Sequence, residues 1–221
     1  MTLEKLVIFG TGDIAQIAAY YFERDGMADV VGFTVDSEYR QADEYEGRPL
    51  VDFETVTERF PVDSHRMFVA LSYAQMNRLR ARKVEEAKSA GYRLASYVSP
   101  NCTYRSQFEP GENAFIFEDN TIQPFVRIGA NVTLWSGNHI GHHSVIEDHN
   151  FVSSHVVISG HCTIDSFCFL GVNSTLAHGI HLAEGTLLGA GAVMTKDSSV
   201  NGVYAPARPT KLPRSSDQIE M

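Results

Sequence analysis

Six of the nine histidines lie within residues 138–162, "NHIGHHSVIEDHNFVSSHVVISGHC", between regularly spaced aliphatic residues. An imidazole titrates near neutral pH, so a histidine can act as a general base or, when neutral, bind a transition metal. This dense group is therefore compatible with three alternatives: a metal site, a catalytic site, or polar decoration of a repetitive scaffold. Which alternative applies depends on how the fold positions these histidines relative to one another.

A six-residue repeat defines that scaffold. Counting in sixes from Ile116 to Met194 passes through fourteen positions, and every one is aliphatic or methionine. The fifth residue of each hexad is mostly small or β-branched, as a narrow inward-facing row requires: Val126, Val132, Ser144, Val156, Cys162, Cys168, Ser174, Thr186 and Ala192. The pattern predicts a hexapeptide parallel β-helix, in which three hexads form one coil and residues 18 apart stack on neighbouring coils.

Six of the histidines fall at two positions of the hexad when the aliphatic residue is counted as position one. Position four holds His143, His149, His155 and His161, and position three holds His142 and His178. Most are expected to be exposed polar residues at the corners of the β-helix. His142 differs, because Gly160 lies one coil beyond it and can bring a backbone N–H close to a bound acyl group. A base beside such a donor forms half of an acyl-transfer site.

A zinc site is the alternative that the histidine spacing leaves open. The gamma-class carbonic anhydrases are β-helix trimers with two zinc-binding histidines two coils apart and a third five residues after the second. His142 and His178 match the first spacing, but the third position is Ala183, and His181 is displaced by two residues. A catalytic zinc normally has three protein ligands, so zinc hydration chemistry is the weaker alternative.

Residues 5–98 follow a different pattern, in which apolar runs alternate with amphipathic segments. "KLVIF", "DVVGFTVD", "MFVALS" and "YRLASYV" are expected strands, and "IAQIAAYYFERDG" and "YAQMNRLRARKVEEAKSAG" are expected helices. "GTGDIA" joins the first strand to the first helix and matches the nucleotide fingerprint GxGxxG/A, with Asp36 at the end of the second strand. The basic run "RLRARK" is interpreted as a solvated helix face. This alternation predicts a small parallel sheet covered by helices.

The charge balance and the apolar runs of the chain indicate which kinds of partner it can bind. The chain has 18 Lys and Arg against 27 Asp and Glu, which argues against a broad nucleic-acid footprint or a polybasic membrane surface. The N-terminus lacks a signal-peptide pattern and no apolar run approaches 18 residues, so we expect a soluble cytoplasmic protein without a membrane partner. Three cysteines without a CxxC pair are expected to be small buried residues.

The combination of "GTGDIA" with "NHIGHHSVI", "ISGHCTIDSFCFLGVNS" and "LLGAGAVMTKD" resembles a known family over nearly the whole chain. It is similar to the hexapeptide-repeat sugar O- and N-acyltransferases related to sialic acid O-acetyltransferase and to the N-acetyltransferases of the bacillosamine and perosamine pathways. The resemblance implies a Rossmann-like α/β domain over residues 1–99 and a left-handed parallel β-helix with a C-terminal arm over residues 100–221. It also implies a homotrimer that uses acetyl-CoA as co-substrate and no metal.

The resemblance assigns roles to individual residues. The catalytic base falls on His142, and the amide that faces the thioester carbonyl falls on Gly160. The implied CoA contacts are Gly160, Gly189, Ala190 and Gly191. The C-terminal segment "VYAPARPTKL" departs from the family's usual ending, so Arg208 and Lys211 are candidates for contacts with the CoA phosphates, and an ordinary solvated arm is the alternative. The implied contacts with a nucleotide-linked sugar are Gly10, Thr11, Gly12, Asp13, Asp36, Ser72 and Tyr73.

One departure concerns the residue after the catalytic base. Several family members have Glu or Asp there, whereas this chain has His143, which can accept a hydrogen bond but lacks a carboxylate's field. A backbone carbonyl, or an acid from a neighbouring coil or subunit, is an alternative orienting group. The expected activity is acetyl-CoA-dependent N-acetylation of a nucleotide-linked amino-deoxysugar; the alternatives are O-acetylation of a sugar hydroxyl, zinc hydration chemistry and a non-enzymatic nucleotide-sensing scaffold.

Overall fold

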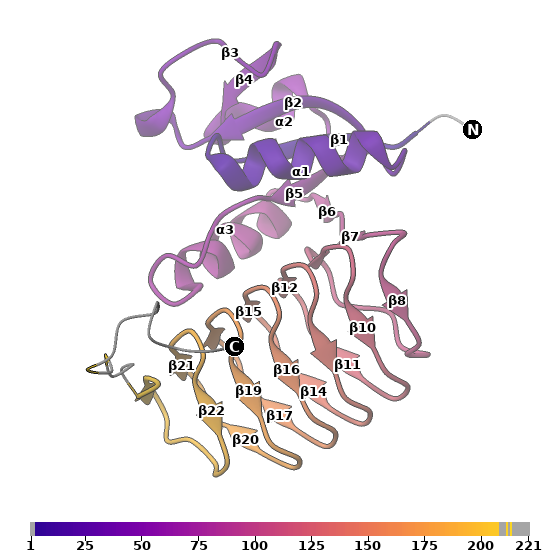
Figure 1. The fold of residues 1–221 in the computed structure, drawn as a ribbon. Coiled ribbons are helices and arrows are strands. Elements are labelled where there is room, and N and C mark those ends of the chain that lie inside the picture. Colours follow the sequence, from indigo (N-terminus) through magenta and orange to yellow (C-terminus); the bar gives the residue numbers. More distant parts are fainter. Residues whose placement is uncertain (1–2, 208–210, 212, 214–221) are drawn as a thin grey trace.

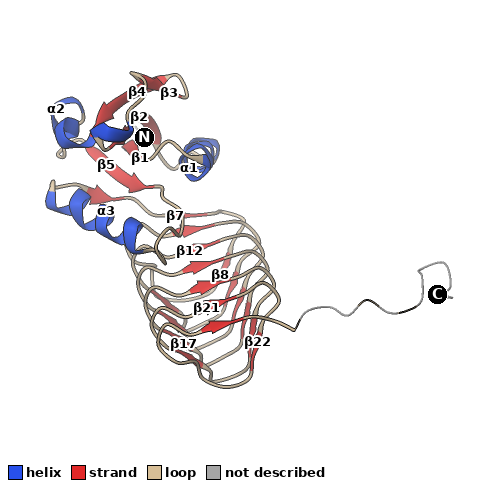
Figure 2. Ribbon diagram, turned by 90° about the vertical axis from the view of Figure 1, so that its left-hand side faces the viewer, coloured by secondary structure: helices blue, strands red, loops and turns tan. Residues whose placement is uncertain are grey.

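The computed structural model describes residues 3–207, 211 and 213 of the 221-residue chain. An α/β unit is followed by a stack of coils, and helix α3 lies between the two (Figures 1 and 2). Among the described residues, no helix has both the length and the apolar character needed to cross a membrane.

The α/β unit is built on one six-stranded sheet of order β3-β4-β2-β1-β5-β6, in which only the β3–β4 pair is antiparallel. Its strands are β1 (Lys5–Phe9), β2 (Asp29–Val35), β3 (Glu44–Tyr45), β4 (Arg48–Asp52), β5 (His65–Val69) and β6 (Arg93–Leu94). Its helices are α1 (Asp13–Arg24), α2 (Val56–Arg59) and α3 (Arg78–Ser89), with short 3-10 turns at Ser37–Tyr39 and Phe53–Thr55. The predicted parallel sheet is therefore present, with an additional β3–β4 hairpin.

Two segments differ from the sequence prediction. The helix expected from residue 73 begins only at Arg78, because Gln75, Met76 and Asn77 all have positive φ and cannot continue into a right-handed helix. "YRLASYV", expected as one strand, divides between two sheets: β6 pairs with β5, whereas β7 (Tyr97–Val98) pairs with the first coil. The division at residue 99 stays a prediction.

The coils form a parallel β-helix with three faces. The first face contains β7, β9 (Phe115–Ile116), β12 (Thr133–Leu134), β15 (Phe151–Val152), β18 (Phe169–Leu170), β21 (Leu187–Leu188) and β23 (Val203–Tyr204). The second contains β8 (Thr103–Tyr104), β10 (Thr121–Ile122), β13 (His139–Ile140), β16 (Val157–Ile158), β19 (Thr175–Leu176) and β22 (Val193–Met194). The third contains β11 (Arg127–Ile128), β14 (Val145–Ile146), β17 (Thr163–Ile164) and β20 (His181–Leu182).

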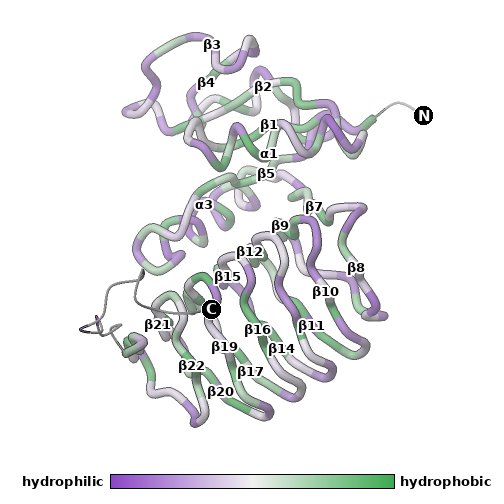
Figure 3. The backbone as a smooth tube through the Cα atoms, viewed as in Figure 1, coloured by the Kyte–Doolittle hydropathy of each residue, from purple (hydrophilic) through white to green (hydrophobic). Residues whose placement is uncertain are grey.

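The register follows the hexad. Ile122 pairs with Ile140, Ile140 with Ile158, and Ile158 with Leu176, so each coil is 18 residues long. All fourteen aliphatic or methionine positions are buried, as is the row at position five. Each such side chain stabilises the fold by about 1.5–3 kcal/mol when fully buried. Figure 3 shows the resulting hydrophobic segments recurring from coil to coil.

Position four of the hexad has a backbone requirement that explains its histidines. His143, His149, His155 and His161 have φ between +58° and +62°, and Gly137 occupies an equivalent corner with φ +79°. Glycine, asparagine, aspartate and histidine tolerate this left-handed region better than bulky or β-branched residues do. Turn geometry therefore accounts for histidine at this position without any chemical role.

The α/β unit packs on the first face of the β-helix. Arg80, only 1% exposed, donates from Nη2 to the carbonyl oxygens of Asn131 and Asn150 at 3.1 and 3.2 Å. Lys83 is largely buried as well, in an ion pair with Asp36. The interpretation of "RLRARK" as a solvated face is therefore wrong for two of its residues, because tertiary contacts cover one side of α3.

Candidate active site

His142 lies at the corner between the second and third faces, in the turn from β13 to β14. Its backbone N–H donates to Oε1 of Gln123 on the preceding coil at 2.8 Å. Its side chain is exposed, while the flanking Gly141 is buried against the next coil. The corner thus fixes the backbone of His142 and places the imidazole on the outer surface of the β-helix.

The imidazole of His142 occupies the space that a side chain at residue 160 would need. A Cβ added to Gly160 would lie 2.8 Å from Cε1 and 2.9 Å from Nε2 of the ring, closer than real Cβ contacts allow. Within residues 3–207, the Gly160 carbonyl accepts a hydrogen bond from Gly179, whereas the Gly160 amide has no acceptor. An imidazole and an amide without an acceptor in this part of the chain therefore lie next to each other, which is the juxtaposition that the sequence predicts.

His143 supplies a partner for the base. The two Nδ1 atoms of His142 and His143 are 3.1 Å apart, at hydrogen-bonding distance. If His142 carries its proton on Nδ1, His143 can accept it, and Nε2 of His142 is left free as a base. Of the orienting groups that the sequence leaves open, His143 is therefore one that lies within hydrogen-bonding distance of the His142 ring.

Two further histidines adjoin this pair. The ring of His161 stacks on that of His143, with centroids 4.8 Å apart and planes 5° apart, and it lies 5.1 Å from the ring of His142. His178 follows at 5.2 Å from His161. Desolvation first, and then the nearby histidines, lower the pKa of His161, which favours its neutral form. The sequence spacing of 18 predicts this stacking, although not its closeness.

The remaining histidines of the repeat lie elsewhere. His149 packs against Phe167, at a different corner, with its Nδ1 3.0 Å from the side-chain nitrogen of Asn131. His181 lies beside Asp165 at 2.9 Å, and Ala183 is buried. Neither residue therefore adds the third ligand that a carbonic-anhydrase-like arrangement of His142 and His178 would need.

A second group of predicted residues lines a cavity of about 470 Å³ at the carboxyl ends of β1 and β2. Gly10, Thr11, Gly12 and Asp36 contribute to its wall, together with Lys83 from α3. Gly10 has φ +122°, and a Cβ there would lie 2.9 Å from the carbonyl oxygen of Ala70, so this turn requires glycine.

The polar groups of this cavity suit a phosphate-bearing ligand. Helix α1 begins at Asp13 after Gly12, which provides no side-chain cap, so N–H groups of the first turn can meet an anion. Nζ of Lys83 lies 2.6 Å from Oδ1 of Asp36 and 2.6 Å from Oε2 of Glu86. The basic run thus contributes a cation that the sequence interpretation missed.

Three residues expected in this pocket do not line it. Asp13 is the first residue of α1 but is absent from the cavity wall, which is reached by Leu71 and not by Ser72 or Tyr73. The ring of Tyr73 instead packs against Phe151 and Phe169 on the first face, at 5.0 and 4.7 Å between centroids.

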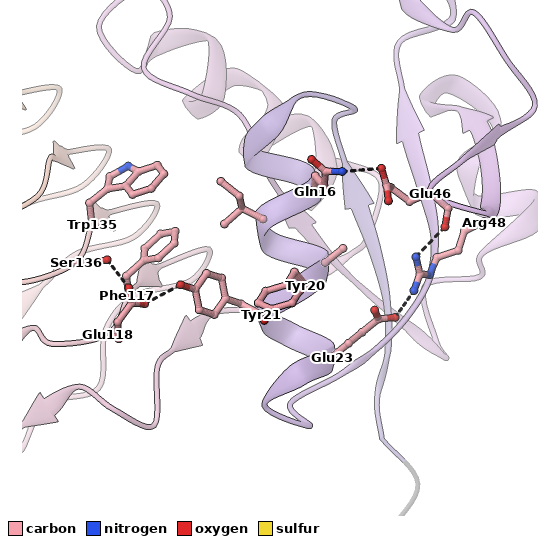
Figure 4. Close-up of a pocket in the computed structure, with 12 residues that line it drawn as sticks. Gln16, Tyr20, Tyr21, Glu23, Glu46, Arg48, Phe117, Glu118, Trp135 and Ser136 are labelled. Atoms are coloured by element: carbon pink, nitrogen blue, oxygen red, sulfur yellow. Dashed lines mark hydrogen bonds and ion pairs between the residues drawn. The ribbon is translucent and has the colours of Figure 1, made fainter.

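A larger cavity, about 630 Å³, lies between α1, the β3–β4 hairpin and the first face (Figure 4). The rings of Phe117 and Trp135 stack at 4.6 Å on one side of it. Glu118 there accepts hydrogen bonds from Tyr21 at 2.8 Å and from Ser136 at 2.7 Å. None of the predicted site residues lines this cavity, and its three carboxylates already have partners: Glu23 pairs with Arg48, Glu46 accepts from Gln16, and Glu118 accepts from Tyr21 and Ser136.

Three of the residues expected to contact CoA lie at a different corner from His142, whereas Gly160 lies beside it. Gly189, Ala190 and Gly191 form the turn from β21 to β22, between the first and second faces. Lys211 is exposed, and Arg208 lies outside the described residues. Within one chain, the Gly189–Gly191 turn and His142 are therefore at different corners of the β-helix.

Comparisons with known proteins establish what the chain resembles. Residues 125–160 match the family model for the bacterial transferase hexapeptide of six repeats, which confirms the predicted repeat. No curated protein matches the chain by sequence.

Solved structures extend the likeness to both halves. The acetyltransferase domain of PglB from Neisseria gonorrhoeae superimposes with a TM-score of 0.79 at 19% identity, covering 94% of this chain and all of that one. PerB from Caulobacter crescentus, solved with CoA and GDP-perosamine, gives 0.77 at 20%, with 93% and 97% covered. WeeI from Acinetobacter baumannii gives 0.79 at 15%, with 90% and 95% covered. The predicted resemblance and the parallel β-helix are thereby confirmed at the level of the fold.

Proposed function

We propose that this chain is an acetyl-CoA-dependent N-acetyltransferase that acts on the amino group of a nucleotide-linked amino-deoxysugar. The observation that carries the proposal is the contact of the exposed His142 imidazole with Gly160, whose backbone N–H has no acceptor within residues 3–207. The fold shared with PglB and PerB, which were solved with acetyl-CoA and with CoA plus GDP-perosamine, supports the same chemistry.

The proposed reaction is direct acyl transfer. The substrate amine attacks the thioester carbonyl of acetyl-CoA, and Nε2 of His142 takes a proton from the nitrogen at or after attack. The Gly160 amide donates to the oxyanion of the tetrahedral intermediate. Collapse breaks the carbon–sulfur bond and releases the CoA thiolate, which takes up a proton, and the acetyl amide remains on the sugar. No covalent enzyme intermediate is needed.

We further propose that the nucleotide of the acceptor binds in the 470 Å³ cavity of a Rossmann-like domain. Its diphosphate would lie at the N-terminus of α1, where first-turn amides are uncapped. Asp36 would meet the ribose or base if ligand binding rearranges its ion pair with Lys83.

A homotrimer of left-handed β-helices completes the proposal. The α/β unit covers the first face, whereas His142 is at the corner opposite that face. Gly189–Gly191 lie at a third position, between the first and second faces. A neighbouring β-helix can bring its own glycine turn and its own α/β unit to the His142 corner, so that donor, acceptor and base meet between subunits.

The test is release of the CoA thiol with UDP-, GDP- and dTDP-linked 3-amino and 4-amino deoxysugars. Wild type should respond to one of these acceptors, and His142→Ala should lower kcat/KM by about 10²–10⁴-fold, or roughly 3–5 kcal/mol. CoA affinity should change little. His155→Asn is the matched control, because His155 is an exposed histidine of the same repeat and asparagine tolerates its φ of +58°.

Two results would overturn the proposal. A fall of less than about threefold in His142→Ala would remove His142 from the role of base, since base assistance is worth far more. Thiol release with sugar hydroxyls but with no amino-sugar would establish O-acetylation instead.

A further inference from the structure

Three imidazoles converge on the exposed corner between the second and third faces. One ring nitrogen from each of His142, His143 and His161 lies within 4.8 Å of the other two, and all three side chains are exposed. Two of the residues are consecutive, and the third lies one coil further along the prism. This cluster of three is distinct from the carbonic-anhydrase-like set, which does not include His143 or His161.

The β-helix holds the backbones of the cluster in place. His143 and His161 both have φ +60°, and the His161 N–H donates to the His142 carbonyl at 2.9 Å. The side chain of Gln123 holds the backbone N–H of His142. Only rotation of exposed side chains is therefore needed to adjust the three rings.

The separations are close to those required by one metal ion. Two histidine nitrogens bound to a tetrahedral zinc at about 2.0–2.1 Å lie about 3.3 Å apart. The Nδ1 atoms of His142 and His143 are already 3.1 Å apart. The widest separation in the cluster, 4.8 Å, would have to shorten by about 1.5 Å, which a side-chain rotation can supply.

The donor set selects the class of ion. Across residues 3–207, the hydrogen bonds and ion pairs of these three side chains include no carboxylate. Three imidazoles without a carboxylate suit zinc, nickel or copper and do not suit magnesium or calcium. Three protein ligands also leave a position for water.

We propose that His142, His143 and His161 form a binding site for a divalent transition metal, with zinc and nickel as its ions. Binding does not depend on the proposed function. Its consequence does: a neutral His142 bound to the metal through Nδ1 carries its proton on Nε2, the nitrogen that would accept the substrate proton, so bound zinc inhibits acyl transfer.

Equilibrium dialysis of the metal-free full-length protein against zinc or nickel chloride tests the site. Wild type should bind one ion per chain, and magnesium chloride should give no binding. His161→Asn should weaken zinc binding by at least about tenfold, because it removes a ligand. His155→Asn, at the same hexad position with the same backbone region, should bind like wild type.

Equal zinc affinity in wild type and His161→Asn, or no zinc binding by folded wild type, would overturn the proposed metal site. Either result holds whatever the outcome of the activity assay. The inhibitory consequence is tested separately by thiol release with and without zinc. Full activity at a zinc concentration that saturates wild type in dialysis would refute inhibition and leave the binding site standing.

Discussion

The ring of His142 lies over Gly160, one coil further along the β-helix, and fills the space of the missing side chain. The pair is therefore one structural unit: the glycine makes room for the imidazole, and its own amide has no acceptor within residues 3–207. The φ of Gly160 lies outside the left-handed range, so alanine is compatible with the backbone at this position.

Gly160→Ala should displace the imidazole without unfolding the chain. An added Cβ at 2.8 Å from the ring forces the ring to move, and a misplacement of about 1 Å in a catalytic group can lower the rate about 100-fold. We expect kcat to fall by about 10- to 100-fold in the thiol-release assay, with the thermal unfolding midpoint nearly unchanged.

A double mutant separates this mechanism from general damage. If Gly160→Ala acts mainly through His142, the variant carrying both Gly160→Ala and His142→Ala should be almost as active as His142→Ala alone. If instead the fold-loss of activity in the double mutant equals the product of the losses in the two single mutants, alanine at 160 acts independently of the imidazole.

His143 is predicted to be a positioning residue for His142. His143→Asn keeps a side chain that tolerates φ +60° but removes the imidazole that is 3.1 Å from Nδ1 of His142. We expect kcat to fall by about tenfold or more. His155→Asn is again the control, and it should retain full activity.

The pH profile distinguishes positioning from a merely structural effect. His143→Asp places a carboxylate beside His142, and a nearby negative charge raises the pKa of an imidazole. The acidic limb of kcat/KM should therefore move to higher pH in His143→Asp. An acidic limb at the wild-type pH in that variant would contradict the assignment.

Sequence periodicity accounts for much of this fold because the hexad directly reflects burial. Ile116 to Met194 fill the interior at every sixth residue, and "KLVIF" coincides with β1. The left-handed turn at residues 75–77 and the burial of Arg80 depend on contacts between distant segments. No local pattern in a single sequence contains that information.

The sequence likewise predicts some features of the candidate site and not others. The 18-residue spacing places Gly160 beside His142, since stacking follows directly from the repeat. It does not give the ring orientations that bring His161 to His143, because these depend on a left-handed backbone at both residues. The proposed meeting of His142 with the Gly189–Gly191 turn involves a second chain, which one sequence cannot position.

Arg80 is predicted to stabilise the junction between the α/β unit and the β-helix. Its guanidinium donates to the carbonyls of Asn131 and Asn150, and burial lowers its pKa to about 9, so it stays charged at neutral pH. Arg80→Met removes the donor that the Asn131 carbonyl has within residues 3–207 and leaves the Asn150 carbonyl with the backbone N–H of Thr133, at 3.0 Å. We expect a loss of about 2–4 kcal/mol in the free energy of unfolding, measured with urea. Arg82→Met, on the exposed side of α3, should stay within about 0.5 kcal/mol of wild type.

His149 should make the protein less stable in acid. Burial is the main cause that lowers the pKa of His149, so the unfolded chain, with a histidine pKa near 6.5, binds a proton more readily than the folded chain. The contribution of His149 to stability is complete above the unfolded value and is lost as pH falls through the folded one.

Replacement of that imidazole should therefore flatten the pH dependence. Urea unfolding at pH 7.5 and pH 5.5, at one protein concentration, should show a smaller loss of stability for His149→Asn than for wild type. Asparagine tolerates the φ of +62° at this corner, so the backbone is retained. His155→Asn should lose as much stability as wild type, because His155 is exposed. Equal losses in His149→Asn and wild type would show that the folded chain accepts the proton on His149 as readily as the unfolded chain does.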